Sequence, residues 1–135
     1  MAQIDLNKYA EFVKIMASVA SSDFDVFTKR TQELHGVNFD VPRVLNGVIG
    51  MSSESGELLE MIKKIVFQGK ELTDENRESM IKELGDVMWY ITQTCLGFGV
   101  TLEEVLKKNV SKLNERYPDS AFDVWYSENR TEENN

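Results

Sequence analysis

The stretch DVPRVLNGVIGMSSESGELLEMIKKIVFQG occupies residues 40–69 and sets the architecture of the chain. Its apolar residues recur at intervals of three and four, which is the pattern of a helix with one or more buried faces. Asp40 can cap this helix, with Pro42 in its first turn. Gly69 suits the left-handed position that follows the last turn of a helix. The pattern therefore predicts one long helix across these residues.

A second long helix is expected from Thr73 to about Leu96. Thr73 is a fair N-cap, although Asn76 replaces the glutamate of a full capping box. The run Gly97-Phe98-Gly99 ends the helix. Because the connection from Gly69 is short, the two helices should pack as an antiparallel hairpin.

Further helices flank this hairpin on both sides. We expect a helical region over residues 5–35, which residues 21–23 can break or recap with Asp23 as N-cap. Thr101 and Glu104 form a capping box for a last helix that ends before Pro118. No stretch alternates as a strand does, so we predict an all-α fold, a helical bundle of four to five helices.

The helix over residues 40–69 is apolar around much of its circumference, which suits a helix packed on several sides. We therefore expect oligomerisation to complete the bundle. Residues 1–118 should form the domain, and residues 119–135 a C-terminal tail that is partly ordered or disordered. The aromatic residues of the tail could anchor it to this subunit or to a neighbour: Phe122, Trp125 and Tyr126.

Composition excludes several classes of function. The net charge of −8 argues against binding a nucleic-acid polymer, which needs a basic face. Cys95 is the single cysteine, so no internal disulfide forms, and the single histidine, His35, argues against a histidine-rich zinc site. No secretory signal and no apolar run long enough for a bilayer are visible, so we expect a cytoplasmic protein without a membrane partner.

Two pairs of acids lie inside the predicted hairpin: Glu54 with Glu57, and Glu83 with Asp86. Residues three apart share a helix face. A hairpin that turns near residues 70–72 brings the two pairs level with each other. Four converging carboxylates repel one another unless a cation lies among them. Oxygen ligands indicate a hard divalent ion, Mg²⁺, with Mn²⁺ as a possible substitute.

The competing interpretation is that these acids form a solvated helix face, which is the commonest environment of glutamate. Two glycines favour a site: Gly56 and Gly85 each precede the second acid of a pair, where a small residue lets neighbouring atoms approach. If the acids are merely solvated, the chain is a non-enzymatic helical interaction module.

The sequence resembles the MazG-like branch of the all-α nucleoside triphosphate pyrophosphohydrolases, over about residues 43–118. That superfamily also holds dimeric dUTPases and phosphoribosyl-ATP pyrophosphohydrolases. The resemblance rests on three segments: Glu54-x-x-Glu57-Leu58-Leu59-Glu60, Glu83-Leu84-Gly85-Asp86-Val87, and the run KNVSKLNERYP at residues 108–118.

The resemblance implies Mg²⁺-dependent hydrolysis of a nucleoside triphosphate between its α- and β-phosphates, giving a monophosphate and pyrophosphate. It implies that Glu54, Glu57, Glu83 and Asp86 bind the metal, and Glu57 or Glu54 would also be the general base. It further implies a homodimer or a homotetramer.

Five other residues are candidates for binding the substrate: Tyr90, Asn109, Lys112, Lys64 and Arg116. Three of them also have ordinary structural interpretations. Tyr90 could be a core tyrosine, Lys64 an ion-pair partner of Glu60, and Arg116 a cation that stabilises a helix C-terminus.

Two alternatives share part of this pattern. The chain could be a dUTPase or a phosphoribosyl-ATP pyrophosphohydrolase, because the acids describe metal and phosphate chemistry and not the choice of base. A di-iron bundle ranks low, since it needs Glu-x-x-His pairs and His35 is far from both acid pairs in the sequence.

Trp89, Phe39 and His35 could stack on a base, but each has a stronger structural interpretation.

Overall fold

The computed structural model describes residues 4–118 and 121–129, and these residues form helices without any β-strand. The all-α prediction is therefore confirmed. The helices in chain order are α1 (Leu6–Met16), the short 3-10 helix η1 (Val19–Ser21), α2 (Phe24–Leu34), α3 (Val41–Gln68), α4 (Asp74–Gly97), α5 (Leu102–Arg116) and α6 (Val124–Glu128).

The chain divides into two compact units, one ending at Gly36 and the other beginning at Val37. The first unit contains α1, η1 and α2. Asp23 caps α2 by accepting a hydrogen bond from the Val26 amide at 2.9 Å, as its position in the sequence predicts. The break before it is longer than expected, because α1 already ends at Met16 and a 3-10 turn follows.

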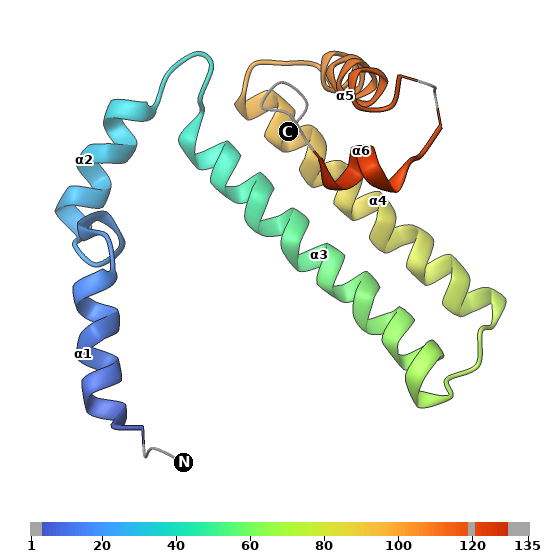
Figure 1. Ribbon diagram of the computed structural model, residues 1–135, viewed down its shortest axis with the longest axis horizontal. Helices are drawn as coiled ribbons and strands as arrows, with labels where there is room; N and C mark the ends of the chain where they lie inside the picture. The colour runs from blue at the N-terminus through green and yellow to red at the C-terminus, as the bar shows by residue number, and fades with distance from the viewer. Residues whose placement is uncertain (1–3, 119–120, 130–135) are drawn as a thin grey trace. The chain divides into compact units, whose positions relative to one another are not determined.

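The second unit is built on the predicted hairpin of α3 and α4, which run antiparallel and side by side (Figure 1). Asp40 caps α3 by accepting from the Arg43 amide at 3.2 Å. Gly69 ends α3 with a φ of 71°, a conformation that glycine adopts without steric cost. Thr73 caps α4 by accepting from the Asn76 amide at 3.2 Å.

Glycines let the two helices of the hairpin approach closely. A Cβ at Gly47 would collide with Thr94, and a Cβ at Gly50 would collide with the ring of Tyr90. These two contacts fix the register of the antiparallel helices. Gly47 lies opposite Thr94, and Gly50, three residues later on α3, lies opposite Tyr90, four residues earlier on α4. Continued by one turn, the same register places Glu54 opposite residues 86–87.

Three contacts join the start of α3 to the end of α4. The Asp40 amide donates a hydrogen bond to the Gly97 carbonyl at 2.8 Å. The Arg43 guanidinium donates to the side-chain oxygen of Gln93 at 3.2 Å. The rings of Phe39 and Phe98, which flank these helix ends, meet edge to face with centroids 5.6 Å apart. The open end of the hairpin is therefore held closed.

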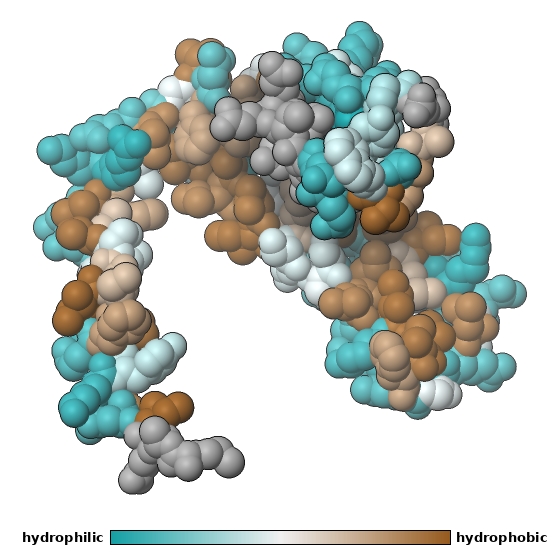
Figure 2. Space-filling view, viewed as in Figure 1, coloured by the Kyte–Doolittle hydropathy of each residue, from teal (hydrophilic) through white to brown (hydrophobic). Residues whose placement is uncertain are grey.

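The interior of the described part of the chain is small. Its buried hydrophobic residues are Val41, Val44 and Cys95, so the single cysteine lies in the core. Many larger apolar side chains of α3 stay exposed, including Ile49, Leu59 and Phe67. Brown side chains accordingly lie at the surface of the hairpin in Figure 2.

The last helices follow the predicted caps. Thr101 and Glu104 make both hydrogen bonds of the capping box, and α5 ends at Arg116. In the tail, Phe122 lies against Tyr117 with ring centroids 5.8 Å apart, whereas Trp125 on α6 is 64% exposed. The tail prediction for residues 119–120 and 130–135 falls outside the described residues. Among the helices described, none combines the length and the apolar character that a membrane span needs.

Candidate metal centre

The structure brings three of the four predicted acids together. Glu54 and Glu57 of α3 and Glu83 of α4 each offer a carboxylate oxygen, and these oxygens all lie within 4.8 Å of one another. The cluster sits at the middle of the hairpin because of the register that Gly47 and Gly50 set. Three carboxylates at this spacing can share a cation of the size of Mg²⁺ or Mn²⁺.

Asp86 lies outside that group of three, but its charge reaches the group. The pKa of Glu54 is raised above its ordinary value by partial burial, and then by the charges of Glu57, Asp86 and Glu83 in that order. Each of these causes disfavours a negative charge on Glu54. A bound cation would reverse this effect, so the charge distribution fits a metal centre.

The cluster is accessible to solvent. Glu54 and Glu83 are half-buried and Glu57 is exposed. A cation could therefore enter from solvent and keep part of its water shell, as Mg²⁺ commonly does in proteins. The donor set consists of carboxylate oxygens alone, which suits a hard ion and does not suit zinc or copper.

Gly56 and Gly85 are expected to let neighbouring atoms approach, and no atom of the described residues does so. A Cβ at either position would meet nothing within 4 Å, so neither glycine serves the packing of one helix on another. Both instead line hollows on the helices that carry the acids. Gly56 belongs to a groove of about 310 Å³ with Ser53, Glu57, Glu60, Met61 and Lys64. Gly85 belongs to a groove of about 410 Å³ with Met88, Trp89, Thr92, Gln93 and Leu96.

Comparison with known families identifies the chain. The MazG nucleotide pyrophosphohydrolase domain matches residues 46–121, which is more than half of the chain and includes all four acids. The chain belongs to the MazG family. The segment of the MazG match also contains both grooves beside the acids.

A relative of this MazG chain is the "Gene 37 protein" of Mycobacterium phage L5. The two are 40% identical over 70 residues, which cover 50% of this chain and 60% of the phage protein. The alignment therefore spans less than two thirds of that relative. No solved structure matches the chain.

Tyr90 of the MazG domain takes part in helix packing. Its ring lies against Gly50 and meets the ring of Trp89 edge to face, with centroids 4.7 Å apart. The ring of Tyr90 is therefore part of the packing between the helices, as the interpretation of Tyr90 as a core tyrosine predicts. A contact between its hydroxyl and a substrate stays a prediction.

Lys64 lies in the groove beside Glu57 and pairs with Glu60 at 3.5 Å. Lys63 pairs with the same carboxylate. The pKa of Glu60 is lowered, first by its hydrogen bond with Lys63 and, after an opposing effect of burial, by the charges of both lysines. Glu60 follows Glu57 by three residues on α3, as Glu57 follows Glu54. Its carboxylate pairs with two lysines, however, and it is not part of the cluster of three acids.

The substrate candidates on α5 are Asn109, Lys112 and Arg116. Asn109 is exposed and Lys112 is half-buried. No hydrogen bond or ion pair in the described part of the chain joins Asn109 or Lys112 to the four acids. Arg116 lies in the last turn of α5, where a cation also stabilises the helix. Contacts of these residues with a nucleotide stay predictions.

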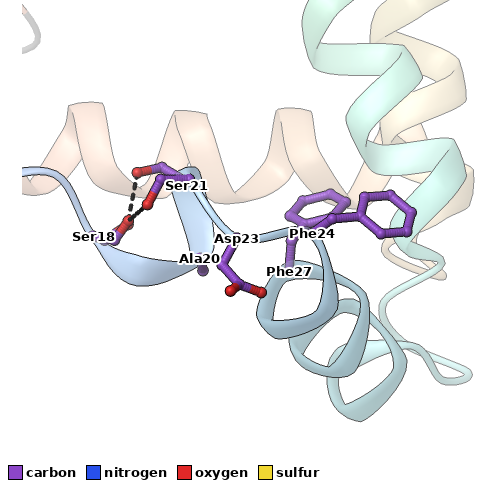
Figure 3. Close-up of a pocket in the computed structure, with 7 residues that line it drawn as sticks. Ser18, Ala20, Ser21, Asp23, Phe24 and Phe27 are labelled. Atoms are coloured by element: carbon purple, nitrogen blue, oxygen red, sulfur yellow. Dashed lines mark hydrogen bonds between the residues drawn. The ribbon is translucent and has the colours of Figure 1, made fainter. Parts of the chain in front are cut away.

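A hollow of about 560 Å³ lies in the first unit, and its lining residues are outside the MazG match (Figure 3). Its polar groups already have partners: Ser21 donates to the Ser18 carbonyl at 2.7 Å, and Asp23 caps α2. Phe24 and Phe27 supply apolar surface. Neither a cluster of acids nor a pair of catalytic groups lines this hollow.

Sequence reasoning missed the two grooves, and it named Trp89 as able to stack on a base but favoured a structural role for it. The signal was present, because Trp89 is three residues beyond Asp86 and therefore lies on a neighbouring part of the same helix surface. An aromatic residue at that spacing is more often part of a core, but the side chain of Trp89 is 52% exposed.

Proposed function

We propose that the protein hydrolyses a nucleoside triphosphate between the α- and β-phosphates, giving a nucleoside monophosphate and pyrophosphate, with Mg²⁺ as the metal. The observation that carries this proposal is the meeting of Glu54, Glu57 and Glu83 within 4.8 Å, inside a segment that matches a nucleotide pyrophosphohydrolase domain. A solvated helix face would not require acids of two helices to converge.

Glu54, Glu57, Glu83 and Asp86 would hold the metal. When bound, Mg²⁺ would acidify a water molecule and neutralise charge on the phosphates. A carboxylate of α3 then takes the proton from the attacking water. Glu57 is exposed to solvent and can reach that water, and Glu54 is the second candidate because its carboxylate lies in the same cluster.

Five further residues would bind the substrate. Lys64 is already in the groove beside Glu57, where its ammonium could turn from Glu60 to a phosphate oxygen. Lys112 and Arg116 would add positive charge, and Asn109 and the Tyr90 hydroxyl would donate or accept hydrogen bonds. The positive charges offset the repulsion between a triphosphate and an acidic protein.

The decisive experiment measures pyrophosphate release from a panel of natural and oxidised nucleoside triphosphates with Mg²⁺, including dUTP and phosphoribosyl-ATP. Release of pyrophosphate, and not of orthophosphate, identifies cleavage between the α- and β-phosphates. Glu57→Ala and Asp86→Ala should abolish release while the helical circular dichroism stays unchanged. Turnover that survives both substitutions, or a panel without any turnover, would contradict the proposal.

We also propose that the protein works as a homo-oligomer, a dimer or a tetramer. The hairpin exposes a series of apolar side chains on both helices, including Ile62, Val66, Ile81 and Leu84. The buried hydrophobic core of a single chain is too small to shield them, and exposed patches of this kind commonly mark protein interfaces. Sedimentation velocity at several concentrations tests this, and a monomer at micromolar concentration would contradict it.

A further inference from the structure

We infer that the base of the nucleotide lies in the groove on α4, stacked on Trp89. This inference rests on the proposed function, because it orients the same substrate whose phosphates would meet the acid cluster. The groove has a volume of about 410 Å³ and is lined by Gly85, Met88, Trp89, Thr92, Gln93 and Leu96. Its volume falls in the range of small-molecule sites.

The groove lies on the helix that carries Glu83 and Asp86, and its lining residues lie between or after these acids along α4. Gly85 is the chain neighbour of Asp86, and Trp89 follows Asp86 by three residues, which is just under one turn of helix. A nucleotide whose phosphates lie at the acid cluster therefore needs to extend by one or two helix turns to place its base on Trp89.

The two grooves differ in the charge of the residues that line them, as the two ends of a nucleoside triphosphate differ in charge. The groove on α3 contains the charged side chains of Lys64, Glu57 and Glu60, together with Ser53. The groove on α4 has no charged residue in its lining and contains Trp89, Met88 and Leu96. The phosphates therefore point toward α3 and the base toward α4.

Trp89 is held in a position that suits stacking. Its ring meets Tyr90 edge to face at 4.7 Å, and Tyr90 is itself packed against Gly50. The side chain is still 52% exposed, so much of its surface is open to a ligand. Gly85 supplies no side chain to fill the groove, and nothing lies within 4 Å of where its Cβ would be.

The test uses the fact that the chain has two tryptophans, Trp89 and Trp125. Trp125→Phe leaves Trp89 as the sole tryptophan, and Trp125 is on α6, outside the groove. The probes are α,β-imido analogues of nucleoside triphosphates with Mg²⁺, and tripolyphosphate with Mg²⁺ as a ligand without a base. The analogues should quench the fluorescence of Trp89, whereas tripolyphosphate should bind without quenching it.

Calorimetry then measures the affinity of Trp89 variants for the same probes. Trp89→Ala should weaken nucleotide binding by about ten- to a hundredfold, the usual effect of losing one stacked base, and Trp89→Phe should restore most of it. Affinity for tripolyphosphate should stay unchanged. Gly85→Ala, which narrows the groove without touching another residue, should also weaken nucleotide binding and spare tripolyphosphate.

Each outcome decides between the two proposals. Equal loss of nucleotide and tripolyphosphate affinity in Trp89→Ala, or nucleotide binding without any change in fluorescence, overturns the inference while leaving the proposed reaction intact. A smaller oligomer in Trp89→Ala would show that a second copy covers the groove, which also overturns the inference. Quenching with no pyrophosphate release from any triphosphate supports the base site and rejects the reaction. Absence of any binding overturns both.

Discussion

The ring of Tyr90 lies against Gly50, where a Cβ would collide with three of its ring carbons. This contact fixes the register of α3 on α4, and the register in turn places Glu54 and Glu57 opposite Glu83. The glycine is therefore a structural requirement of the acid cluster, although it lies a full turn away from the first acid.

Gly50→Ala should destabilise the protein by about 1–3 kcal/mol, the usual cost of adding a methyl group to a close-packed site. The matched control is Gly56→Ala on the same helix, where nothing lies within 4 Å of the added carbon. The control should stabilise the protein by about 0.5–1 kcal/mol, because alanine loses less conformational entropy in a helix. Urea unfolding measures both, and equal effects of the two substitutions would contradict the proposed close contact.

Glu83→Gln should remove the stabilisation that Mg²⁺ gives. A ligand at about 100 times its Kd stabilises the folded state by about 2.7 kcal/mol, so Mg²⁺ should raise the Tm of the unmodified protein by several degrees. The control is Glu78→Gln on the same helix, since Glu78 is exposed and pairs with Arg77. Differential scanning calorimetry with Mg²⁺ and with EDTA measures the shift. A shift that persists in Glu83→Gln, or disappears in Glu78→Gln, would place the metal elsewhere.

Glu54 should make the stability of the metal-free protein depend on pH. Its pKa in the folded state is raised above the ordinary 4.5, first by partial burial and then by Glu57, Asp86 and Glu83. Between 4.5 and that raised pKa the folded state binds more protons than the unfolded state, so the free energy of unfolding falls as pH rises. Below this window Glu54 is protonated in both states, so its contribution to the free energy of unfolding does not change with pH. Above the window it is ionised in both states, and the loss of stability is complete.

Glu54→Gln isolates this contribution. In EDTA, the variant should gain stability relative to the unmodified protein as pH rises from about 4.5, and the gain should level off above the raised pKa. Urea unfolding at a series of pH values measures the difference. A difference that does not change with pH would show that Glu54 experiences neither burial nor the charges of its neighbours.

Thr101→Ala should destabilise the protein by about 1 kcal/mol, because Thr101 accepts a hydrogen bond from the Glu104 amide and so caps α5. Thr101→Ser keeps the hydroxyl and should restore most of the loss. Urea unfolding of the three proteins tests this. An equal loss in both variants would assign the effect to the methyl group of Thr101 and not to the cap.

Helix ends were predictable from the sequence, because local chemistry sets them. Asp23, Asp40, Thr73 and Thr101 all act as the N-caps that their positions predict, and Gly69 ends α3. The short connection after Gly69 was enough to predict that the two acid pairs lie level.

The roles of individual glycines and aromatics could not be read in the same way. Gly50 and Gly56 stand in the same helix, yet one faces Tyr90 and the other faces a groove. The choice depends on the rotation of α3 about its axis, which packing determines. Likewise, helical spacing places Trp89 beside Asp86 but does not say that half of its side chain remains exposed.

The hydrogen bond from the Asp40 amide to the Gly97 carbonyl joins the hairpin opposite its turn, so α3 and α4 are tied together at both ends. The acids lie midway along the two helices, between these joined ends. A cation too large for the cluster would have to separate two helices that are joined at both ends, or else bind fewer of the carboxylates. Discrimination between ions would then come from backbone rigidity as much as from the choice of ligands.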